Sequence, residues 1–228
     1  AQPIIPVYDI AGNFAGSKSP TMGNASNPVA VLTRNKDNSS NDIRVLANAF
    51  AEINLLNTVT FKSLIGLDYN RNISTSYSLK DPEFSEANTV DQLTKNYSGG
   101  LQYNWSNTLN FNKIHSLNIL LGSEVIEYEW EWMFGGRSTY AFTNKDYMVL
   151  DAGEAGQRSG GSFDAWSTVS YFGRLNYILL DKYLLEGVFR RDASSRFSES
   201  NRWGTFPAFS AGWIISDEIF MKDINWLN

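Results

Sequence analysis

Apolar and polar residues alternate with a period of two along most of the chain beyond residue 45. In residues 97–112 the odd-numbered positions are mostly apolar or aromatic, whereas the even-numbered positions hold only Ser, Gly, Gln, Asn and Thr. A period of two places side chains of one kind on one face of an extended strand. We therefore expect an all-β fold with little helix and with strands near residues 45–56, 59–70, 97–111, 116–134, 165–178, 183–192 and 204–216.

The connections between these strands alternate between short and long. Such alternation is typical of outer-membrane β-barrels, which have short periplasmic turns and long extracellular loops. The sequence therefore predicts an antiparallel up-and-down transmembrane β-barrel segment over residues 45–228. Residues 1–44, which hold most of the prolines, are expected to be an irregular extracellular loop region. Short connections are predicted at 57–58, 112–115 and 179–182, a modest one at 217–225, and long ones at 71–96, 135–164 and 193–203.

Charged residues avoid one face of each predicted strand near its centre. A Lys or Arg that faces lipid in the middle of a bilayer costs about 2–4 kcal/mol, so an uncharged face is suited to lipid. The opposite face holds Glu52, Lys62, Asp68, Glu124, Arg174, Glu186 and Arg190. Aromatic residues gather near strand ends, where amphipathic rings prefer the membrane interface. The predicted membrane-interface aromatics are Tyr69, Tyr97, Phe111, Tyr177, Tyr183 and Trp213.

A soluble β-sandwich is the alternative fold, because its buried core would give the same alternation. In that case the chain would be a surface-attached module that binds glycans. For the barrel interpretation, an odd number of strands is a difficulty, since bacterial single-chain barrels have even counts. An open arc would also leave unpaired strand edges in lipid. The chain is therefore interpreted as a part of a larger barrel.

Composition narrows the possible functions further. The 228 residues include 43% hydrophobic and only 19% charged residues, with a net charge of −5, which disfavours binding to nucleic acid. Cysteine is absent and His115 is the one histidine, so a disulfide framework and thiolate or multi-histidine metal sites are excluded. No nucleophile, base or metal set stands out. We expect no enzyme activity, no cofactor and no metal.

The stretch from Gly173 to Glu218 contains a series of short runs in a fixed order. They are Gly173-Arg174-Leu175-Asn176-Tyr177, Asp181-Lys182-Tyr183-Leu184-Leu185, Arg190 and Asp192, Ser194-Ser195-Arg196-Phe197, Asn201-Arg202-Trp203-Gly204-Thr205-Phe206-Pro207, Ser210-Ala211-Gly212-Trp213 and Ile215-Ser216. This series resembles the barrel of SusC/RagA-type TonB-linked transporters of the Bacteroidetes outer membrane. The resemblance departs at Ala193, where the family usually has Gly, and weaker similarity lies in residues 27–30 and 48–53.

The resemblance implies a barrel of about 22 strands filled by a plug, in the cell outer membrane. It implies a SusD-like lipoprotein lid over the outer mouth, and import of oligosaccharides or peptides driven by TonB. On this interpretation the chain is a partial barrel from which the signal peptide, the plug and the C-terminal strand are absent. The TonB complex would act through those absent parts. The expected partners are therefore the lid, the TonB complex, the substrate and membrane lipid, with no nucleic acid.

Two rows of side chains are candidate contacts for a substrate or a partner. If the strand from 116 continues to 134, it exceeds the roughly 9–11 residues that cross a bilayer and projects outside the cell. Its far end would present a carboxylate row on one face and an aromatic row on the other. The carboxylates could equally be a solvated face, and catalysis by them is least favoured. The rows are Glu127, Glu129 and Glu131, and Tyr128, Trp130 and Trp132.

The apolar pattern changes faces within this strand, which predicts a β-bulge near 125–127. At the end of a later strand, Arg190, Asp192 and Arg196 are predicted to pair and brace the external loop that follows. The glycine-rich stretch 135–164 is interpreted as a mobile extracellular loop rather than a phosphate-binding loop, because no P-loop Lys-Ser/Thr pair follows it. His115 is interpreted as a surface residue in a short turn.

Overall fold

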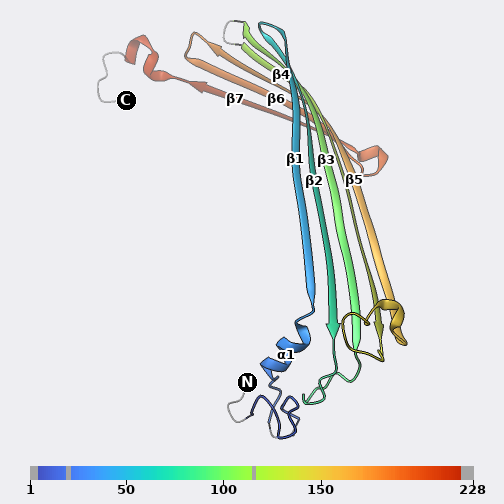
Figure 1. Ribbon diagram of the computed structural model, residues 1–228. Coiled ribbons are helices and arrows are strands. Elements are labelled where there is room, and N and C mark those ends of the chain that lie inside the picture. Colours follow the sequence, from blue (N-terminus) through green and yellow to red (C-terminus); the bar gives the residue numbers. More distant parts are fainter. Residues whose placement is uncertain (1–4, 19–21, 115–116, 222–228) are drawn as a thin grey trace. The chain divides into compact units, whose positions relative to one another are not determined.

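The computed structural model describes residues 5–18, 22–114 and 117–221. Figure 1 shows strands β1–β7 following one another in chain order, with one α-helix, α1 (Pro28–Asn35), before them. Short 3-10 helices are η1 (Leu150–Ala152), η2 (Glu199–Asn201), η3 (Ile215–Asp217) and η4 (Ile219–Met221). The strands are β1 (Ser39–Leu56), β2 (Val59–Ser78), β3 (Gln92–Ile114), β4 (Leu117–Ser138), β5 (Ala155–Leu179), β6 (Tyr183–Ser194) and β7 (Trp203–Trp213).

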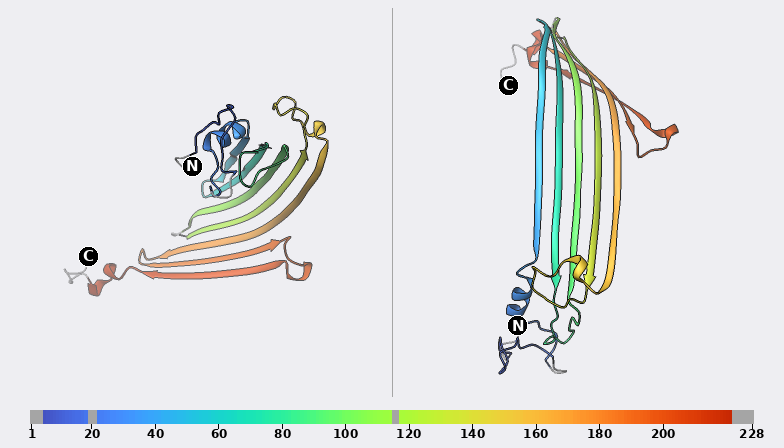
Figure 2. Two further views of the ribbon diagram at one scale, coloured as in Figure 1. Left: turned by 90° about the horizontal axis from the view of Figure 1, so that it is seen from below. Right: turned by 45° about the vertical axis from the view of Figure 1, so that its right-hand side comes forward.

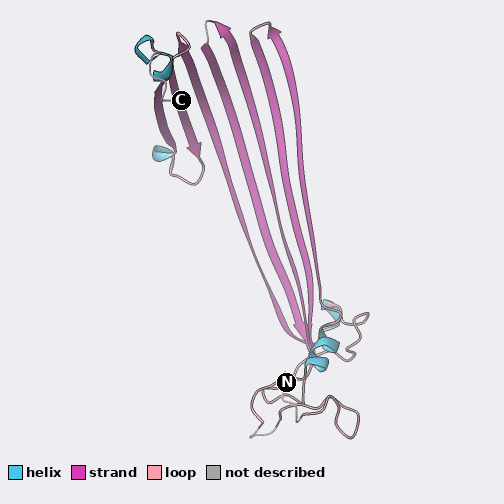
Figure 3. Cartoon of the chain, turned by 90° about the vertical axis from the view of Figure 1, so that its left-hand side faces the viewer, coloured by secondary structure: helices cyan, strands magenta, loops and turns pink. Residues whose placement is uncertain are grey.

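The seven strands form one sheet in which each strand pairs with its neighbours in the chain, in the order β1-β2-β3-β4-β5-β6-β7. The pairing is antiparallel, with Tyr177 opposite Leu185 and Leu185 opposite Ala211. Figures 2 and 3 show the strands side by side as an up-and-down meander. The predicted all-β barrel segment is confirmed. A β-sandwich needs a second sheet facing the first, and the described residues form a single sheet.

Several strands are longer than predicted at the end away from the short connections. β2 continues to Ser78 and β3 begins at Gln92, so the connection between them is much shorter than the predicted 71–96. β4 continues to Ser138 and β5 begins at Ala155, so several glycines assigned to a loop lie in strands. Residues 70–76 are polar on both faces apart from Ile73, which removes the alternation that marks a strand. Backbone pairing continues there because a hydrogen-bonded ladder does not require an apolar face.

Residues 1–44 are more regular than predicted. Asn27 caps α1: its Oδ1 accepts hydrogen bonds from the backbone N–H groups of Val29 (3.1 Å) and Ala30 (3.3 Å). Pro28 follows at the first helical position, where its missing N–H costs nothing. β1 begins at Ser39, and the Asn72 amide binds Ser40 at 2.8 Å. A polar run that resembled a loop is therefore the start of a strand.

The chain divides into two compact units. The first contains residues 1–44, 70–100 and 130–163, and the second contains residues 45–69, 101–129 and 164–228. None of the helices among the described residues is both long and apolar enough to cross a membrane.

The first unit has a small hydrophobic core between its connections. Leu93, Tyr140 and Met148 are buried there, and Tyr77, Leu79 and Leu150 pack against them. Asp91 is also buried, and its carboxylate accepts a hydrogen bond from the Lys80 backbone N–H at 2.9 Å. Packing and hydrogen bonds thus hold the connections 79–91 and 139–154. The interpretation of 135–164 as a mobile loop did not include such contacts.

Candidate functional site

The two faces of the sheet differ in chemistry within the second unit. By the register, even-numbered residues of β5, β6 and β7 share one face and odd-numbered residues share the other. Side-chain contacts show the same parity in earlier strands, because odd-numbered residues contact one another. Leu121 of β4 lies next to Gly173 of β5. The Trp105 indole of β3 donates to Ser63 Oγ of β2 at 2.9 Å. We call the even-numbered side, which holds Glu124, Arg174, Glu186 and Arg190, the polar face, and the odd-numbered side the apolar face.

Exposed large apolar side chains follow the same division. In β3–β7 of the second unit they belong to the apolar face, apart from Ile178, Leu184 and Phe206. The apolar-face members are Tyr103, Trp105, Leu121, Tyr171, Leu175, Leu179, Leu185, Phe189, Trp203, Phe209 and Trp213. Eleven exposed large side chains on one face of a sheet are unusual for a soluble protein, which indicates contact with lipid or protein.

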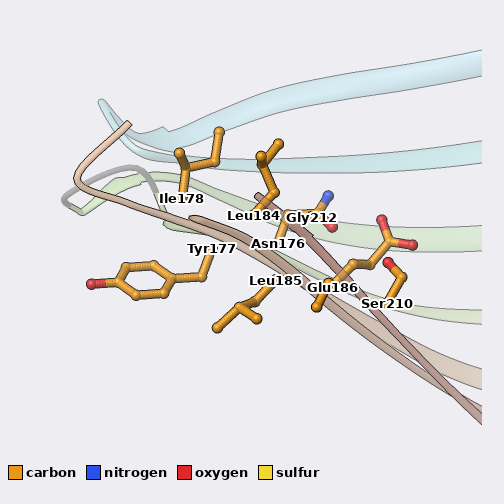
Figure 4. Close-up of a pocket in the computed structure, with 9 residues that line it drawn as sticks. Asn176, Tyr177, Ile178, Leu184, Leu185, Glu186, Ser210 and Gly212 are labelled. Carbon is orange, nitrogen blue, oxygen red and sulfur yellow. The ribbon is translucent and has the colours of Figure 1, made fainter. Parts of the chain in front are cut away.

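An open groove of about 470 Å³ lies near the β5–β6 turn. Figure 4 shows Ile178 and Leu184 pointing to one side of the strands, and Tyr177 and Leu185 to the other. Asn176 is opposite Glu186, which is opposite Ser210, so three polar side chains share the side of Ile178 and Leu184. The groove therefore combines polar and apolar groups on the polar face.

Arg190 is the centre of a hydrogen-bond network on the polar face. Its Nε donates to both carboxylate oxygens of Asp192, at 2.8 and 3.0 Å. Its Nη2 donates to Ser170 Oγ at 2.9 Å and to Glu124 Oε2 at 3.3 Å. The guanidinium also lies 5.5 Å from the ring centroid of Phe172. One arginine thus links β4, β5 and β6.

Arg196 pairs with a different carboxylate from the one that binds Arg190. Its Nη2 donates to Asp164 of β5 at 2.6 Å. Beside it, the Ser195 backbone N–H donates to the Ser167 carbonyl at 2.9 Å, and the Ser167 N–H donates to Ser195 Oγ at 2.8 Å. These contacts join the start of the connection 195–202 to β5, as a brace for that connection requires. The bracing role of Arg190, Asp192 and Arg196 stays a prediction.

Tyr128, the first ring of the aromatic row of β4, lies on the polar face. Tyr128 stacks on Trp166 of β5 with ring centroids 5.5 Å apart. Gly122 lies under the ring of Phe172, where a Cβ would come within 2.4 Å of ring atoms. Between these two contacts β4 and β5 each advance by six residues, so neither strand contains an extra residue that the other lacks. The predicted bulge near 125–127 is therefore wrong.

The outer part of the row is in the first unit. Trp132 stacks on Phe134 with centroids 6.0 Å apart and planes 5° apart. Gly160 lies beneath Phe134, and a Cβ there would come within 2.6 Å of the ring. A glycine opposite the ring lets it lie close to the strand. Tyr128, Trp130, Trp132 and Phe134 are all half-buried.

The carboxylate row of β4 lies on the apolar face. Glu127 accepts a hydrogen bond from the hydroxyl of Tyr103, which belongs to that face of β3. Glu129 and Glu131 are exposed. The structure therefore separates the two candidate rows, with aromatic rings on one side of β4 and carboxylates on the other. Odd-numbered positions of β4 are apolar at Leu117, Ile119 and Leu121 and carry carboxylates at 127–131. Even-numbered positions are polar at Asn118 and Glu124 and carry aromatic rings at 128–132.

Two of the predicted interface aromatics are held by one carboxylate. Tyr183 and Trp213 stack with centroids 6.3 Å apart. The Tyr183 hydroxyl donates to Glu218 Oε1 at 2.8 Å, and the Trp213 indole N–H donates to the same oxygen at 3.1 Å. Lys182 Nζ donates to Glu218 Oε2 at 3.1 Å. The hydrogen bonds from Tyr183, Trp213 and Lys182 hold the pKa of Glu218 below its ordinary value.

The remaining predicted interface aromatics lie in less uniform places. Tyr177 is close to the end of β5, and Figure 4 shows its phenol on the side of the strands opposite to Ile178 and Leu184. Phe111 is close to the end of β3. Tyr69 and Tyr97 lie well inside β2 and β3, because both strands extend farther than predicted. Their interface role stays a prediction.

Among the described residues, no group of three or more His, Asp or Glu side chains could hold a metal ion. His115 lies outside the described residues. The Gly135–Gly136 pair lies within β4, and Gly153 precedes β5, where a Cβ would meet Arg137 at 2.5 Å.

Comparisons with known proteins agree with this geometry. No protein-family model matches the sequence. The chain is 31% identical over 208 residues to the TonB-dependent receptor SusC of Bacteroides thetaiotaomicron, which covers 89% of the chain and 20% of that receptor. It is 26% identical over 234 residues to the TonB-dependent receptor P3 of Formosa agariphila, covering 98% of the chain and 22% of the receptor.

Solved structures give the same match. The structure of the RagAB peptide transporter superposes with a TM-score of 0.81 at 22% identity, covering 97% of the chain and 25% of that chain. The RagAB peptide importer in its 'open-open' state gives the same TM-score and identity. At this identity the likeness shows the fold. The chain spans about a fifth of the length of its curated relatives. The resemblance to a partial SusC/RagA-type barrel is confirmed.

Proposed function

We propose that this chain forms part of the wall of a TonB-dependent importer in the outer membrane. The observation that carries the proposal is the division of the sheet into an apolar face and a polar face that holds the Arg190 network. In a closed barrel the apolar face contacts lipid and the polar face lines the interior, where charges are tolerated. The similarity to TonB-dependent receptors supports this assignment.

The aromatic row of β4 is the proposed contact for the imported substrate. Its rings lie on the face that lines the interior, at the end of the strand near the long connections. Aromatic rings stack on sugar rings and on the apolar side chains of peptides, so they suit either an oligosaccharide or a peptide. The carboxylates Glu129 and Glu131 are on the opposite side of the strand, so contact with the substrate is assigned to the rings.

The partners of the whole transporter follow the same proposal. A SusD-like lipoprotein would cover the outer mouth, over the long connections. The TonB complex would supply energy through parts of the transporter outside this chain. The RagAB structures support this proposal, because their chain of similar fold belongs to a peptide transporter. The substrate crosses without chemical change, so no catalytic group is required.

Uptake measurements on variants test the role of the aromatic row. Trp130→Ala and Trp132→Ala should each lower uptake at limiting substrate, whereas Met133→Ala should not. Met133 is a matched control because it lies between these rings in sequence, faces the other side of β4 and is 51% exposed. Unchanged uptake in both tryptophan variants, with normal amounts of protein in the membrane, would contradict the substrate contact.

A further inference from the structure

Large apolar side chains are exposed at the end of the sheet that has the short connections. Leu180, in the β5–β6 turn, is 72% exposed, and Ile219 and Phe220, after β7, are 79% and 63% exposed. Ile215, which also follows β7, is 43% exposed. The β5–β6 turn and the segment after β7 are joined by a backbone hydrogen bond, in which the Ile214 N–H donates to the Lys182 carbonyl at 2.9 Å. We call Leu180, Ile215, Ile219 and Phe220 the turn patch.

The backbone conformation of the β5–β6 turn is also unusual for a leucine. Leu180 has φ +54° and Asp181 has φ +57°, the left-handed conformation that favours Gly, Asn and Asp. A leucine in that conformation is strained and, in water, would also expose its side chain unfavourably. Positive φ at both central residues is usual in tight hairpin turns, so the exposed leucine side chain is the feature that is not expected of a turn that faces bulk water.

The turn patch is held in a fixed arrangement beside the interface aromatics. The Glu218 carboxylate joins the two connections, since it accepts hydrogen bonds from Lys182, Tyr183 and Trp213. The ring of Phe220 packs edge-on against Trp213, with centroids 6.4 Å apart. The patch therefore continues the apolar face beyond the end of β7, with Lys182 and Glu218 neutralising each other within it.

We propose that the turn patch is a membrane anchor that inserts into the lipid leaflet bordering the short connections, between the headgroups and the acyl chains. This inference rests on the proposed function, because it requires the apolar face to contact lipid. Tyr and Trp prefer that depth, and short apolar segments beside them bury their side chains there. The occupant is lipid because the patch is continuous with the apolar face, whose member Trp213 packs against Phe220.

An anchor at this position fixes the depth of the sheet in the bilayer. The strands could otherwise slide along the membrane normal, because the cost of hydrophobic mismatch is small for each ångström. Side chains that extend sideways from the last turn oppose that movement.

Depth measurements in lipid test the anchor. The chain has no cysteine, so a single introduced thiol can be labelled with a fluorophore in the intact protein, with any cysteine elsewhere in a longer chain replaced. Ile219→Cys and Phe220→Cys are the test variants, in vesicles that contain a nitroxide lipid labelled either near the headgroup or near the end of the acyl chain. Phe209→Cys, on the apolar face and 85% exposed, is the control for lipid contact, and its neighbour Ser210→Cys is the control for the polar face.

The anchor predicts that labels at 219 and 220 are quenched at least about twofold more by the shallow nitroxide than by the deep one, whereas a label at 209 shows a deeper position. If label 209 is quenched but labels 219 and 220 are quenched no more than label 210, the anchor is wrong and protein or water covers the patch. If label 209 is also not quenched, the assignment of the apolar face to lipid fails, and the anchor fails with it.

Discussion

Tyr128 on β4 and Trp166 on β5 stack with ring centroids 5.5 Å apart and planes 27° apart. Because β4 and β5 keep the same parity from Gly122 to Tyr128, this pair lies on the face that carries Glu124 and Arg190. The aromatic row is thus wider than one strand, and its rings are positioned by a neighbour rather than by alternation alone.

Loss of the Trp166 ring should weaken substrate uptake. Trp166→Ala removes a stacking partner whose contribution is about 0.5–1.5 kcal/mol, so the half-saturating substrate concentration should rise roughly 2- to 10-fold. Tyr171→Ala is the control, because Tyr171 is an exposed aromatic on the other face of β5. Equal effects of the two substitutions on uptake would show that the polar face has no special role.

Arg190→Ala should destabilise the sheet more than Arg174→Ala. Arg190 has ion pairs with Asp192 and Glu124, whereas among the described residues no ion pair or hydrogen bond is found for Arg174, on the same face. The Arg190 side chain is 40% exposed, so solvent screening limits the loss to about 1 kcal/mol. The measurement is the midpoint of thermal unfolding of the purified protein in detergent. Equal midpoints for both variants would show that the Arg190 network does not stabilise the sheet.

Acid should weaken the attachment between the two short connections. The folded-state pKa of Glu218 lies below its ordinary value of 4.5, so its contribution to stability is fully present above that value. The contribution is lost as the pH falls through the folded-state pKa. The difference in unfolding midpoint between the parent protein and Glu218→Gln should therefore be largest near neutral pH and shrink towards pH 3. If the difference in unfolding midpoint grew as the pH fell, the ionised Glu218 carboxylate would not be the stabilising form.

A half-buried ion pair should hold residues 7–18 in place. Arg34 donates two hydrogen bonds to the Glu83 carboxylate, and their side chains are 19% and 13% exposed. Although partial burial raises the pKa of Glu83, the hydrogen bonds and charge of Arg34 hold it below its ordinary value. Glu83→Gln leaves Arg34 without its anion, which costs about 1–3 kcal/mol locally.

Limited proteolysis measures this local loss, because cleavage in residues 7–18 should become several-fold faster in Glu83→Gln. Glu86→Gln is the matched control, since Glu86 is exposed and lies three residues away in the same connection. Faster cleavage in both variants would show that charge, rather than the ion pair, controls access.

The sequence predicted the central parts of the strands well, because one face of each strand is regularly apolar there. β6 was predicted at 183–192 and extends from Tyr183 to Ser194. Outside that zone both faces meet polar surroundings, so the alternation that would have marked residues 70–78 and 155–164 is absent while backbone pairing continues. The helix α1 is only eight residues long, and its signals were the Asn27 cap and Pro28.

The alternation of a carboxylate row and an aromatic row along β4 was predicted from the sequence, but the face that Tyr128 occupies was not. The role of Tyr128, Trp130 and Trp132 stays a prediction. The bulge was inferred on the assumption that apolar residues stay on one side of the strand. In the structure the aromatic rings and the carboxylates Glu129 and Glu131 alternate along β4 without a bulge. Trp166 and Phe134 were missed because their place in the row depends on cross-strand packing.

Thiol labelling on intact cells tests the membrane topology most directly. Ser200→Cys in the connection 195–202 and Ser216→Cys after β7 are conservative changes at exposed positions at opposite ends of the strands. A membrane-impermeant maleimide should label position 200 on intact cells, and should label position 216 only after the outer membrane is opened. Equal labelling of both positions on intact cells, or labelling of position 216 alone, would contradict a sheet that crosses the outer membrane.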